Sequence, residues 1–246
     1  MSRIVLVTGA GRGIGKGLVT HYLGQPNTTV IGTVRDTTSA KAKELESLPK
    51  ADESRLILVA YVVDNATSAT EAVAELQARH GINHLDIVIA NAGICDHWSP
   101  VSEAADADLV SHFEVNTLGL LRLFRALAPL LQKAATPKFV YISTLLGSIG
   151  AIGQYPSMTG PYGMSKVAGN FMVRKIHMEN EHLTTLAVDP GLVQTDLGDR
   201  AARFYGLDKA PVTLEESVRG ITTQIEKVDK STSGSFVNCQ GETVPW

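Results

Sequence analysis

A tyrosine and a lysine four positions apart, Tyr162 and Lys166, are the residues of this chain best suited to acid–base chemistry. They follow Pro161, which is typical of a helix start, and on a helix this spacing places both side chains on one face. A free phenol has a pKa of about 10, which is poorly matched to neutral pH, and a neighbouring ammonium lowers that pKa. The pair therefore indicates a group that protonates a carbonyl oxygen, or removes the proton in the reverse direction.

A glycine-rich turn directly follows the first apolar run, where Gly9, Gly13 and Gly15 are spaced G-x-x-x-G-x-G. Glycines at such a turn let the backbone approach a pyrophosphate at the start of a helix, so the pattern favours nucleotide binding. A phosphate-binding P-loop is the rival interpretation. It fails because Ala10 replaces its first glycine and Gly17 replaces the hydroxyl residue that would bind magnesium.

These residues must be positioned by alternating strands and helices. The expected strands are short, apolar and rich in β-branched residues, as in a parallel sheet covered on both faces: Arg3–Val7, Thr28–Val34, Arg55–Val63, Leu85–Ala90, Lys138–Ser143, Thr184–Val188 and Ser235–Asn238. The expected helices are 13–24, 38–47, 67–80, 106–132, 162–180 and 214–228. This alternation predicts an α/β fold with a doubly wound parallel sheet. Residues 144–161 and 192–212 fit neither pattern, and both follow a strand, so we expect them at the ligand-binding edge of the sheet.

Composition narrows the function classes. The net charge of −3 argues against a nucleic-acid partner, and Cys95 and Cys239 are too few for a disulfide framework or a zinc site, so no metal is expected. No run approaches the roughly 20 apolar residues of a membrane helix, so we expect a cytoplasmic protein without a membrane partner. Without a linker, repeat or low-complexity tract, residues 1–246 are predicted to form one domain.

The ordered motifs resemble those of the short-chain dehydrogenase/reductase family over essentially the whole chain. Besides the glycine turn, they are the segment Asn91-Ala92-Gly93, Asn116, the segment from Tyr162 to Lys166, and Pro190-Gly191. The resemblance implies a Rossmann-type sheet of about seven strands with helices on both faces, and a nicotinamide cofactor. Residues 234–246 look similar to the sniffer-type carbonyl reductases and to fungal polyketide ketoreductases.

The family also implies a catalytic hydroxyl and an asparagine beside the tyrosine and lysine. Relatives usually end the fifth strand with Ser-Ser, whereas this chain has Ser143-Thr144, so Thr144 aligns with the catalytic position and Ser143 is the alternative. Ser148 is a distant third candidate for the catalytic hydroxyl. Asn116 resembles the family residue that bends the long helix and holds a water linked to Lys166.

NADP(H) is the expected cofactor. Where NAD-preferring relatives carry an acid after the second strand, this chain has Val34 and then Arg35, and the resemblance brings Arg12 to the same neighbourhood. Two guanidiniums suit a phosphate dianion, although Asp36 could pair with Arg35. The remaining cofactor contacts are implied by the resemblance alone and comprise Gly9, Gly13, Ile14, Gly15, Asp64, Asn65, Asn91, Ala92, Gly93, Tyr162, Lys166, Pro190, Gly191, Val193 and Thr195.

The expected reaction is the NADPH-dependent reduction of a small hydrophobic ketone, aldehyde or quinone-like substrate. Its pocket is predicted to be apolar and aromatic, with a lid at about 192–212. The candidate pocket residues are Cys95, His97, Trp98, Ile149, Tyr155, Met158, Phe204 and Tyr205. Two other family chemistries fit less well. Enoyl reductases need a lysine seven residues after their tyrosine, and Tyr155 with Met158 leads instead to Tyr162; sugar epimerases are longer and differ in glycine spacing.

A non-catalytic NADP-binding regulatory protein is the alternative function, but it would not need Tyr162, Lys166 or Asn116. By analogy with relatives we expect a homodimer or homotetramer built on helices 106–132 and 162–180. Four apolar side chains of the first of these helices either form that interface or pack on the sheet: Leu118, Leu121, Phe124 and Leu127.

Overall fold

A seven-stranded sheet forms the centre of the computed structural model, which describes residues 2–154 and 157–246. Within these residues all strand pairs are parallel and the order is β3-β2-β1-β4-β5-β6-β7. The strands are β1 (Arg3–Val7), β2 (Thr28–Val34), β3 (Arg55–Ala60), β4 (Ile87–Ala90), β5 (Lys138–Ile142), β6 (Thr184–Asp189) and β7 (Ser235–Asn238). The predicted fold class is confirmed, although the predicted third strand ran three residues too far, to Val63, and the fourth began two residues too early, at Leu85.

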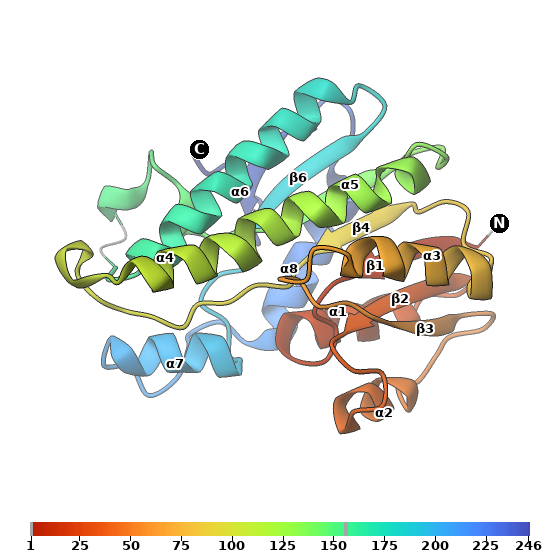
Figure 1. Ribbon diagram of the computed structural model, residues 1–246, viewed down its shortest axis with the longest axis horizontal. Helices are drawn as coiled ribbons and strands as arrows, with labels where there is room; N and C mark the ends of the chain where they lie inside the picture. The colour runs from red at the N-terminus through yellow and green to blue at the C-terminus, as the bar shows by residue number, and fades with distance from the viewer. Residues whose placement is uncertain (1, 155–156) are drawn as a thin grey trace.

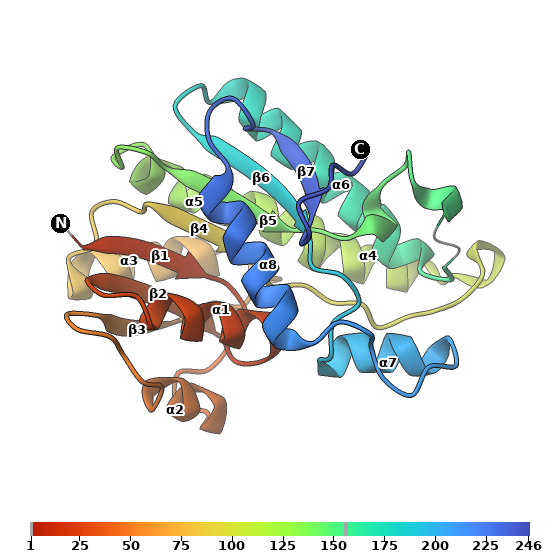
Figure 2. The same ribbon diagram turned by 180° about the vertical axis from the view of Figure 1, so that it is seen from behind.

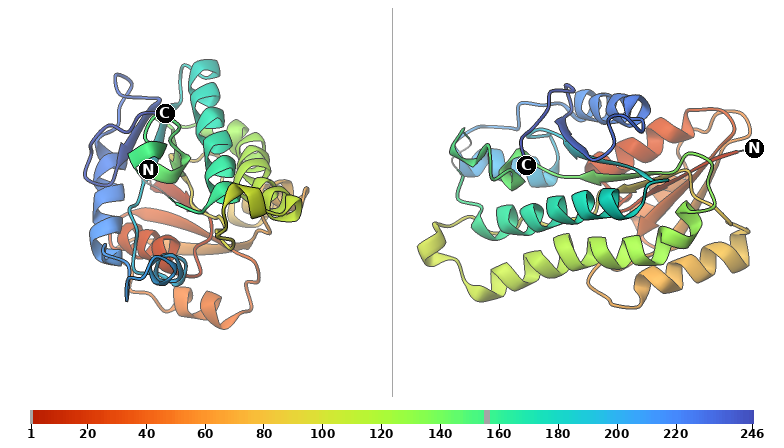
Figure 3. Two further views of the ribbon diagram at one scale, coloured as in Figure 1. Left: turned by 90° about the vertical axis from the view of Figure 1, so that its left-hand side faces the viewer. Right: turned by 90° about the horizontal axis from the view of Figure 1, so that it is seen from above.

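Helices cover both faces of the sheet. Those in Figure 1 are α3 (Ser68–His80), α4 (Asp106–Phe113), α5 (Gly119–Leu131) and α6 (Gly160–Glu179). The opposite face, seen in Figure 2, is covered by α1 (Gly13–Leu23) and α8 (Leu214–Lys227), while α2 (Ala40–Glu46) lies beside the sheet edge and α7 (Asp196–Phe204) below the strand ends. The edge views in Figure 3 show the sheet between these two helical layers.

Two hydrophobic clusters, one on each face, hold the layers together. Successive residues of β1 alternate between them: Ile4 and Leu6 face α3, α5 and α6, whereas Val5 and Val7 face α1 and α8. Each fully buried Leu, Ile or Val side chain stabilises the fold by about 1.5–3 kcal/mol. Phe124 and Leu127 of α5 pack into the first cluster, so they serve the sheet, whereas Leu118 and Leu121 are only half-buried.

The predicted helix 106–132 is interrupted. Residues Glu114–Leu118 form a π-helical turn between α4 and α5. A π-turn adds a residue to one turn and rotates the side chains that follow it, and such turns are frequent at functional sites. Here it carries Asn116, which the resemblance associates with a bend in this helix.

The strand order creates a cleft at the carboxyl ends of β1 and β4. The chain runs outward from β1 to β3, then crosses back to place β4 on the other side of β1. The loops after these two strands therefore leave in opposite directions, and open α/β sheets bind ligands at this point. In the described part of the chain, no helix is long and apolar enough to cross a membrane.

Candidate active site

A cleft of about 1410 Å³ opens at the carboxyl ends of the strands. Pockets for small ligands typically measure about 300–1000 Å³, so this one has room for a dinucleotide together with a substrate. Most of the predicted site residues line it, namely Gly9, Arg12, Gly13, Ile14, Arg35, Asp64, Asn91, Ala92, Gly93, Ser143, Thr144, Tyr162, Lys166, Pro190, Gly191, Val193 and Thr195. Gly15, Asn65 and Asn116 lie next to it without forming its wall.

The glycine turn is shaped by backbone conformations that favour glycine. Gly9 has a φ of 68° and Gly13 a φ of 52°, both in the left-handed region. A Cβ on Gly15 would collide with the carbonyl oxygen of Gly9, so Gly15 is required for the turn to fold against α1 rather than for contact with a ligand. The first turn of α1 contains no acidic residue, which leaves its N-terminus favourable for an anion.

Thr8 ties the glycine turn to the end of β4. Its hydroxyl accepts hydrogen bonds from the backbone N–H groups of Asn91 and Ala92, both at 3.0 Å. The Asn91 side chain donates back to the Thr8 carbonyl at 2.8 Å. These bonds fix the floor of the cleft where β1 and β4 diverge.

Tyr162 and Thr144 meet inside the cleft. Tyr162 lies in the first turn of α6, and the Thr144 side chain is the neighbour that lowers the pKa of its phenol. The two alternative hydroxyls are engaged elsewhere, because Ser143 donates to Asn170 Oδ1 and Ser148 to the Pro245 carbonyl, both at 2.5 Å. Of the three hydroxyls considered, only that of Thr144 affects the pKa of the phenol within the described residues, and its oxygen also accepts from Leu146 N at 3.3 Å.

Lys166 is buried beside the tyrosine, with 4% of its surface exposed. Its ammonium donates to the Ile142 carbonyl at 2.8 Å and lies 5.7 Å from the centre of the Tyr162 ring. The ring of Tyr141 is closer, at 4.6 Å, and offers its negative face to the cation. Burial nevertheless lowers the pKa of Lys166 to about 8, since the desolvated ammonium is disfavoured.

The pKa of the Tyr162 phenol is raised well above its usual value, whereas the sequence predicted a lowered one. Burial is the main cause, because it removes the phenolate from water, and the nearby Cys95, Tyr141 and Asp189 add to it, while the Thr144 side chain opposes it. Lys166 is not among the groups that lower this pKa. In the structure the phenol is therefore neutral, and a neutral phenol is the form that donates a proton.

Asn116 acts on the backbone beside the cleft. Its Oδ1 accepts from Ile94 N, and its Nδ2 donates to the Ile94 carbonyl and to Ser165 Oγ, all at 2.9 Å. A Cβ on Gly93 would lie 2.9 Å from Asn116 Oδ1 and 3.6 Å from Lys166 Nζ, so a larger residue would crowd this corner. Asn116 thus holds the segment after β4 against α6.

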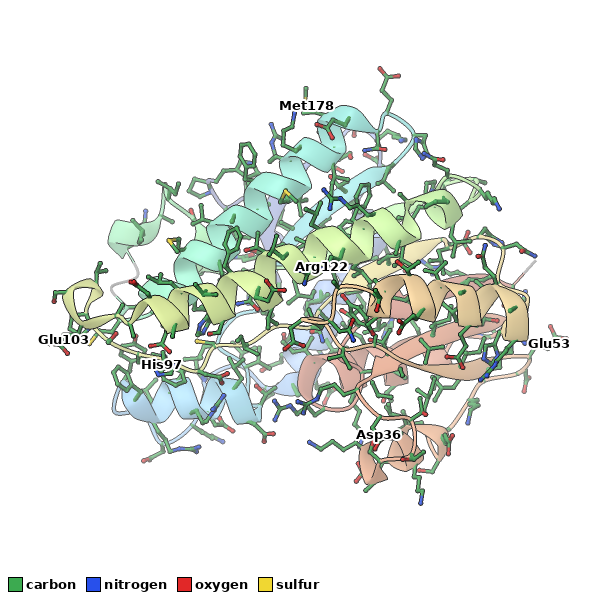
Figure 4. The ribbon with its side chains drawn as sticks, in the orientation of Figure 1. Asp36, Glu53, His97, Glu103, Arg122 and Met178 are labelled. Carbon is green, nitrogen blue, oxygen red and sulfur yellow. The ribbon has the colours of Figure 1, made fainter. Side chains whose placement is uncertain are left out.

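Cationic side chains gather where β2 ends. Arg35 is exposed there, and Asp36 does not pair with it: the Asp36 carboxylate accepts from the Thr38 backbone N–H at 2.8 Å and from its hydroxyl at 2.6 Å (Figure 4). Arg12 does have an acidic partner, Asp196, at 3.0 Å.

Asp64 and Asn65 separate at the end of the next loop. Asp64 lines the cleft, whereas Asn65 accepts from the Thr67 backbone N–H at 2.9 Å ahead of α3. Asn65 is therefore engaged with its own chain rather than with the cleft.

An aromatic wall of Trp98 and Tyr205 lines the far end of the cleft, where α7 meets the loop after β4. The predicted pocket residues Phe204 and Met158 are about half exposed and do not line the cleft. The ring of Phe204 stacks on that of Trp98 at 5.8 Å, and the Tyr205 hydroxyl accepts from Met158 N at 2.8 Å. Arg200 strengthens this contact, since it pairs with Asp96 at 3.0 Å. The helix α7 was not predicted from the sequence.

The other predicted pocket residues divide into two groups. Cys95 lines the cleft and is buried, which raises its pKa to about 12. Ile149 is exposed, and His97 contacts Asp108 at 3.1 Å, and neither residue lines the cleft. Tyr155 lies outside the described residues. No cluster of His, Cys, Asp or Glu suited to a metal occurs in the part of the chain that the structure describes.

Residues 3–205 match the family model described as short chain dehydrogenase. The chain belongs to the short-chain dehydrogenase family. The norsolorinic acid ketoreductase of Dothistroma septosporum is 42% identical to it, covering 98% of this dehydrogenase and 91% of the relative. The short-chain dehydrogenase srdF of Neurospora crassa is 38% identical, covering 100% of this chain and 98% of the relative.

Solved structures agree with the family assignment. The NADPH-bound carbonyl reductase from chicken fatty liver superposes with a TM-score of 0.86 at 31% identity, covering 100% of this dehydrogenase and 99% of that chain. The carbonyl reductase Sniffer of D. melanogaster shares the fold, with a TM-score of 0.85 at 24% identity and full coverage of both chains. The predicted resemblance and the Rossmann-type architecture are confirmed.

Three charged residues of this dehydrogenase line the cleft but were not predicted from the sequence, Lys41, Asp189 and Asp196. Lys41 lies in α2, close to Gly11 of the glycine turn, and its place in a charged helix gave no sign of this. Asp189 is the last residue of an otherwise apolar strand, β6. An acid at that position was a usable signal, since the strand end adjoins Pro190-Gly191.

Proposed function

We propose that this dehydrogenase uses NADPH to reduce the carbonyl group of a hydrophobic ketone, aldehyde or quinone-like compound to an alcohol. The observation that carries the proposal is that Tyr162, Thr144 and the buried Lys166 line the same cleft as the glycine turn, with the Lys166 ammonium 5.7 Å from the centre of the Tyr162 ring. An acid and a nucleotide cradle in one cleft are what a nicotinamide-dependent carbonyl reduction requires.

The cleft suits a dinucleotide in shape and charge. Gly9 and Gly13 adopt left-handed backbone conformations, the N-terminus of α1 carries no acid, and Gly15 has no room for a side chain. We propose that this turn holds the pyrophosphate, that Asp64 contacts the adenine, and that the segment from Pro190 to Thr195 borders the nicotinamide. Once bound, the cofactor supplies a hydride to the carbonyl carbon.

Selection of NADPH over NADH is assigned to Arg35, with Lys41 and Arg12 in support. Arg35 is exposed, lines the cleft and makes no ion pair within the described residues, so it is available to a 2′-phosphate. Asp196 competes for Arg12, which makes Arg12 the weaker contributor. Solved relatives described as NADPH-bound or NADP-bound support the same choice.

The chain's own part in the reaction is to hold and deliver a proton. Tyr162 keeps its proton because it is buried, and it releases that proton to the carbonyl oxygen as negative charge develops there. The Thr144 hydroxyl orients the same oxygen. Lys166, when charged, stabilises the phenolate left behind, and Asn116 keeps the neighbouring backbone in place.

The aromatic wall and the buried Cys95 favour a flat, hydrophobic substrate. Relatives about 40% identical along nearly their whole length are named norsolorinic acid ketoreductases, which makes norsolorinic acid a rational first substrate to test. We propose residues 192–212 as the lid over this end of the cleft. Its ends are held together by a bridge between Val193 and Val212.

The test is NADPH oxidation by the purified protein over a panel of ketones, aldehydes and quinones that includes norsolorinic acid. We expect Tyr162→Phe to reduce kcat by at least about 100-fold while NADPH affinity is retained. Tyr22→Phe is the matched control, because it removes from α1 a buried phenol hydroxyl that has no hydrogen-bond partner among the described residues and is remote from the reaction. Turnover by Tyr162→Phe near that of the wild type would reject the catalytic role. NADPH binding with no turnover of any compound would instead favour the regulatory alternative.

We further propose that a second copy of the chain covers the outer face of α6. Met164, Phe171 and Met178 are 50%, 65% and 68% exposed and recur every seven residues, so they share one face of the helix; Figure 4 shows Met178 at its outer end. In a two-fold dimer Phe171 would meet its own copy, and Met164 would meet Met178, because both lie seven residues from Phe171. Sedimentation should show a dimer or tetramer that Phe171→Glu dissociates, and a wild-type monomer would reject the interface.

A further inference from the structure

Asp189 is a buried carboxylate inside the cleft for which the proposed reaction has no use. Only 4% of its surface is exposed, and no cation pairs with it within the described residues. Its two oxygens accept backbone hydrogen bonds instead, Oδ1 from Leu145 N at 2.8 Å and Oδ2 from Gly191 N at 3.0 Å. Burial raises the pKa of Asp189, because a buried charge without a counter-ion is costly, and the two backbone hydrogen bonds oppose that rise. A carboxyl group retained at this cost is a candidate for function.

The first of these bonds extends the sheet past its end. The β5–β6 ladder closes with Ser143 N donating to the Val188 carbonyl at 2.7 Å, and the two backbones then separate. The Asp189 carboxylate takes the place of a backbone carbonyl and accepts the N–H of Leu145. Thr144 therefore lies between two residues that are both hydrogen-bonded to β6.

The second bond fixes the opposite wall of the cleft. Gly191 has a φ of 79°, in the left-handed region, and begins the segment that leads to Val193 and Thr195. Its N–H is held by the same carboxylate that holds Leu145. A single side chain thus joins the turn that carries the catalytic hydroxyl to the segment proposed to border the nicotinamide.

We propose that Asp189 is a positioning residue, whose carboxylate keeps the Thr144 hydroxyl and the Gly191 turn at a fixed separation, so that the proton-donating groups and the cofactor side of the cleft stay in register. This inference rests on the proposed function, because it is the reduction of a carbonyl that requires the Thr144 hydroxyl and the Gly191 turn to stay at a fixed separation.

A carboxylate does this better than an amide of the same shape. Both Asp189 oxygens accept from N–H donors, whereas an asparagine offers one acceptor oxygen and turns its own N–H₂ group towards the second donor. The titratable groups that face Asp189 are the Tyr162 phenol on α6 and the Cys239 thiol after β7. Removal of the negative charge from Asp189 also lowers the pKa of Tyr162, because the nearby carboxylate raises it.

The test compares Asp189→Asn with Asp86→Asn, a matched control at the opposite edge of the sheet. Asp86 also accepts a backbone hydrogen bond, from Ile4 N at 2.8 Å, but it precedes β4 and is remote from the cleft. For Asp189→Asn we expect kcat to fall by about 10- to 100-fold, the scale of a misplaced catalytic group, with little change in the KM for NADPH. The alkaline limb of its pH–kcat profile should move to lower pH. Asp86→Asn should keep the wild-type kcat and profile.

Amide hydrogen exchange provides a readout that does not depend on turnover. Asp189→Asn should accelerate exchange at whichever of Leu145 and Gly191 faces the new N–H₂ group. Asp86→Asn should leave exchange at Ile4 unchanged, because the one acceptor oxygen of asparagine can keep that single bond. Faster exchange with an unchanged kcat and pH profile would overturn the proposal, since the bonds would then be merely structural. A loss of kcat with unchanged exchange would overturn it as well. If the wild type reduces no carbonyl compound, the proposed function fails, while the exchange result still reports whether Asp189 holds the backbone.

Discussion

Removal of the buried ammonium of Lys166 should stabilise the protein at neutral pH while abolishing its activity. In the folded state the pKa of Lys166 falls from 10.5 to about 8, so the folded protein binds this proton less tightly than the unfolded chain does. By linkage, the charged lysine lowers the free energy of unfolding by about 3 kcal/mol at pH values well below 8. This destabilisation fades as the pH rises from about 8 to 10.5, because both states then lose the proton.

Lys166→Met removes the charge and keeps an unbranched side chain of similar length. It also deletes the hydrogen bond from Nζ to the Ile142 carbonyl, at a cost of about 1 kcal/mol. We therefore expect the free energy of unfolding to increase by about 2 kcal/mol at pH 7 and the gain to disappear by about pH 10.

Urea unfolding of both proteins at pH 7 and pH 10, followed by circular dichroism, measures this difference. Lys133→Met, which removes an exposed lysine beyond α5, should show no such dependence on pH. A variant that is less stable than the wild type by the same amount at both pH values would refute the reasoning, because the buried charge would then carry no cost.

Three other changes test the site. Arg35→Asp should shift the preference towards NADH by about 10-fold or more, measured as the ratio of kcat/KM for the two coenzymes, because the new carboxylate repels a 2′-phosphate; an unchanged ratio would remove Arg35 from that contact. Thr144→Val should lower kcat by about 100-fold. Ser143→Ala breaks only a hydrogen bond to Asn170 and should retain most of the wild-type kcat. A larger loss of kcat in Ser143→Ala than in Thr144→Val would assign the catalytic hydroxyl to Ser143. Phe204→Ala should raise the KM for an aromatic ketone about 10-fold with a smaller effect on kcat, because it removes the ring that supports Trp98 in the cleft wall. An unaffected KM would mean that this support plays no part in substrate binding.

Much of the framework was predictable from the sequence because it depends on local patterns. Runs such as Thr28–Val34 are apolar and β-branched, so they indicate strands covered on both faces, and the structure gives this strand the same bounds. The predicted helix 214–228 likewise begins where α8 does, at the residue after Thr213, whose side chain forms a capping box with Glu216. The spacing of Tyr162 and Lys166 was enough to place both on one side of a helix in the cleft.

The features that escaped prediction depend on contacts between distant segments. The helix α7 contains Gly198, which reads as a helix breaker, yet a side chain there would collide with the Val193 backbone, so the close approach explains the glycine. The proton affinity of Tyr162 is governed by burial beneath several elements, which spacing along the chain does not reveal. Asp189 was overlooked because its role requires knowing that the turn after β5 passes over the end of β6.

The buried thiol of Cys95 has a consequence for the compounds that this cleft can admit. Quinones and related conjugated ketones are electrophiles that form covalent adducts with thiolates, and a reactive cysteine beside the phenol would be consumed by such compounds. Because the pKa of Cys95 is about 12, the thiolate is almost absent at neutral pH, and the side chain behaves as a small apolar surface. The wall next to the proton donor is thereby protected from self-inactivation by electrophilic substrates.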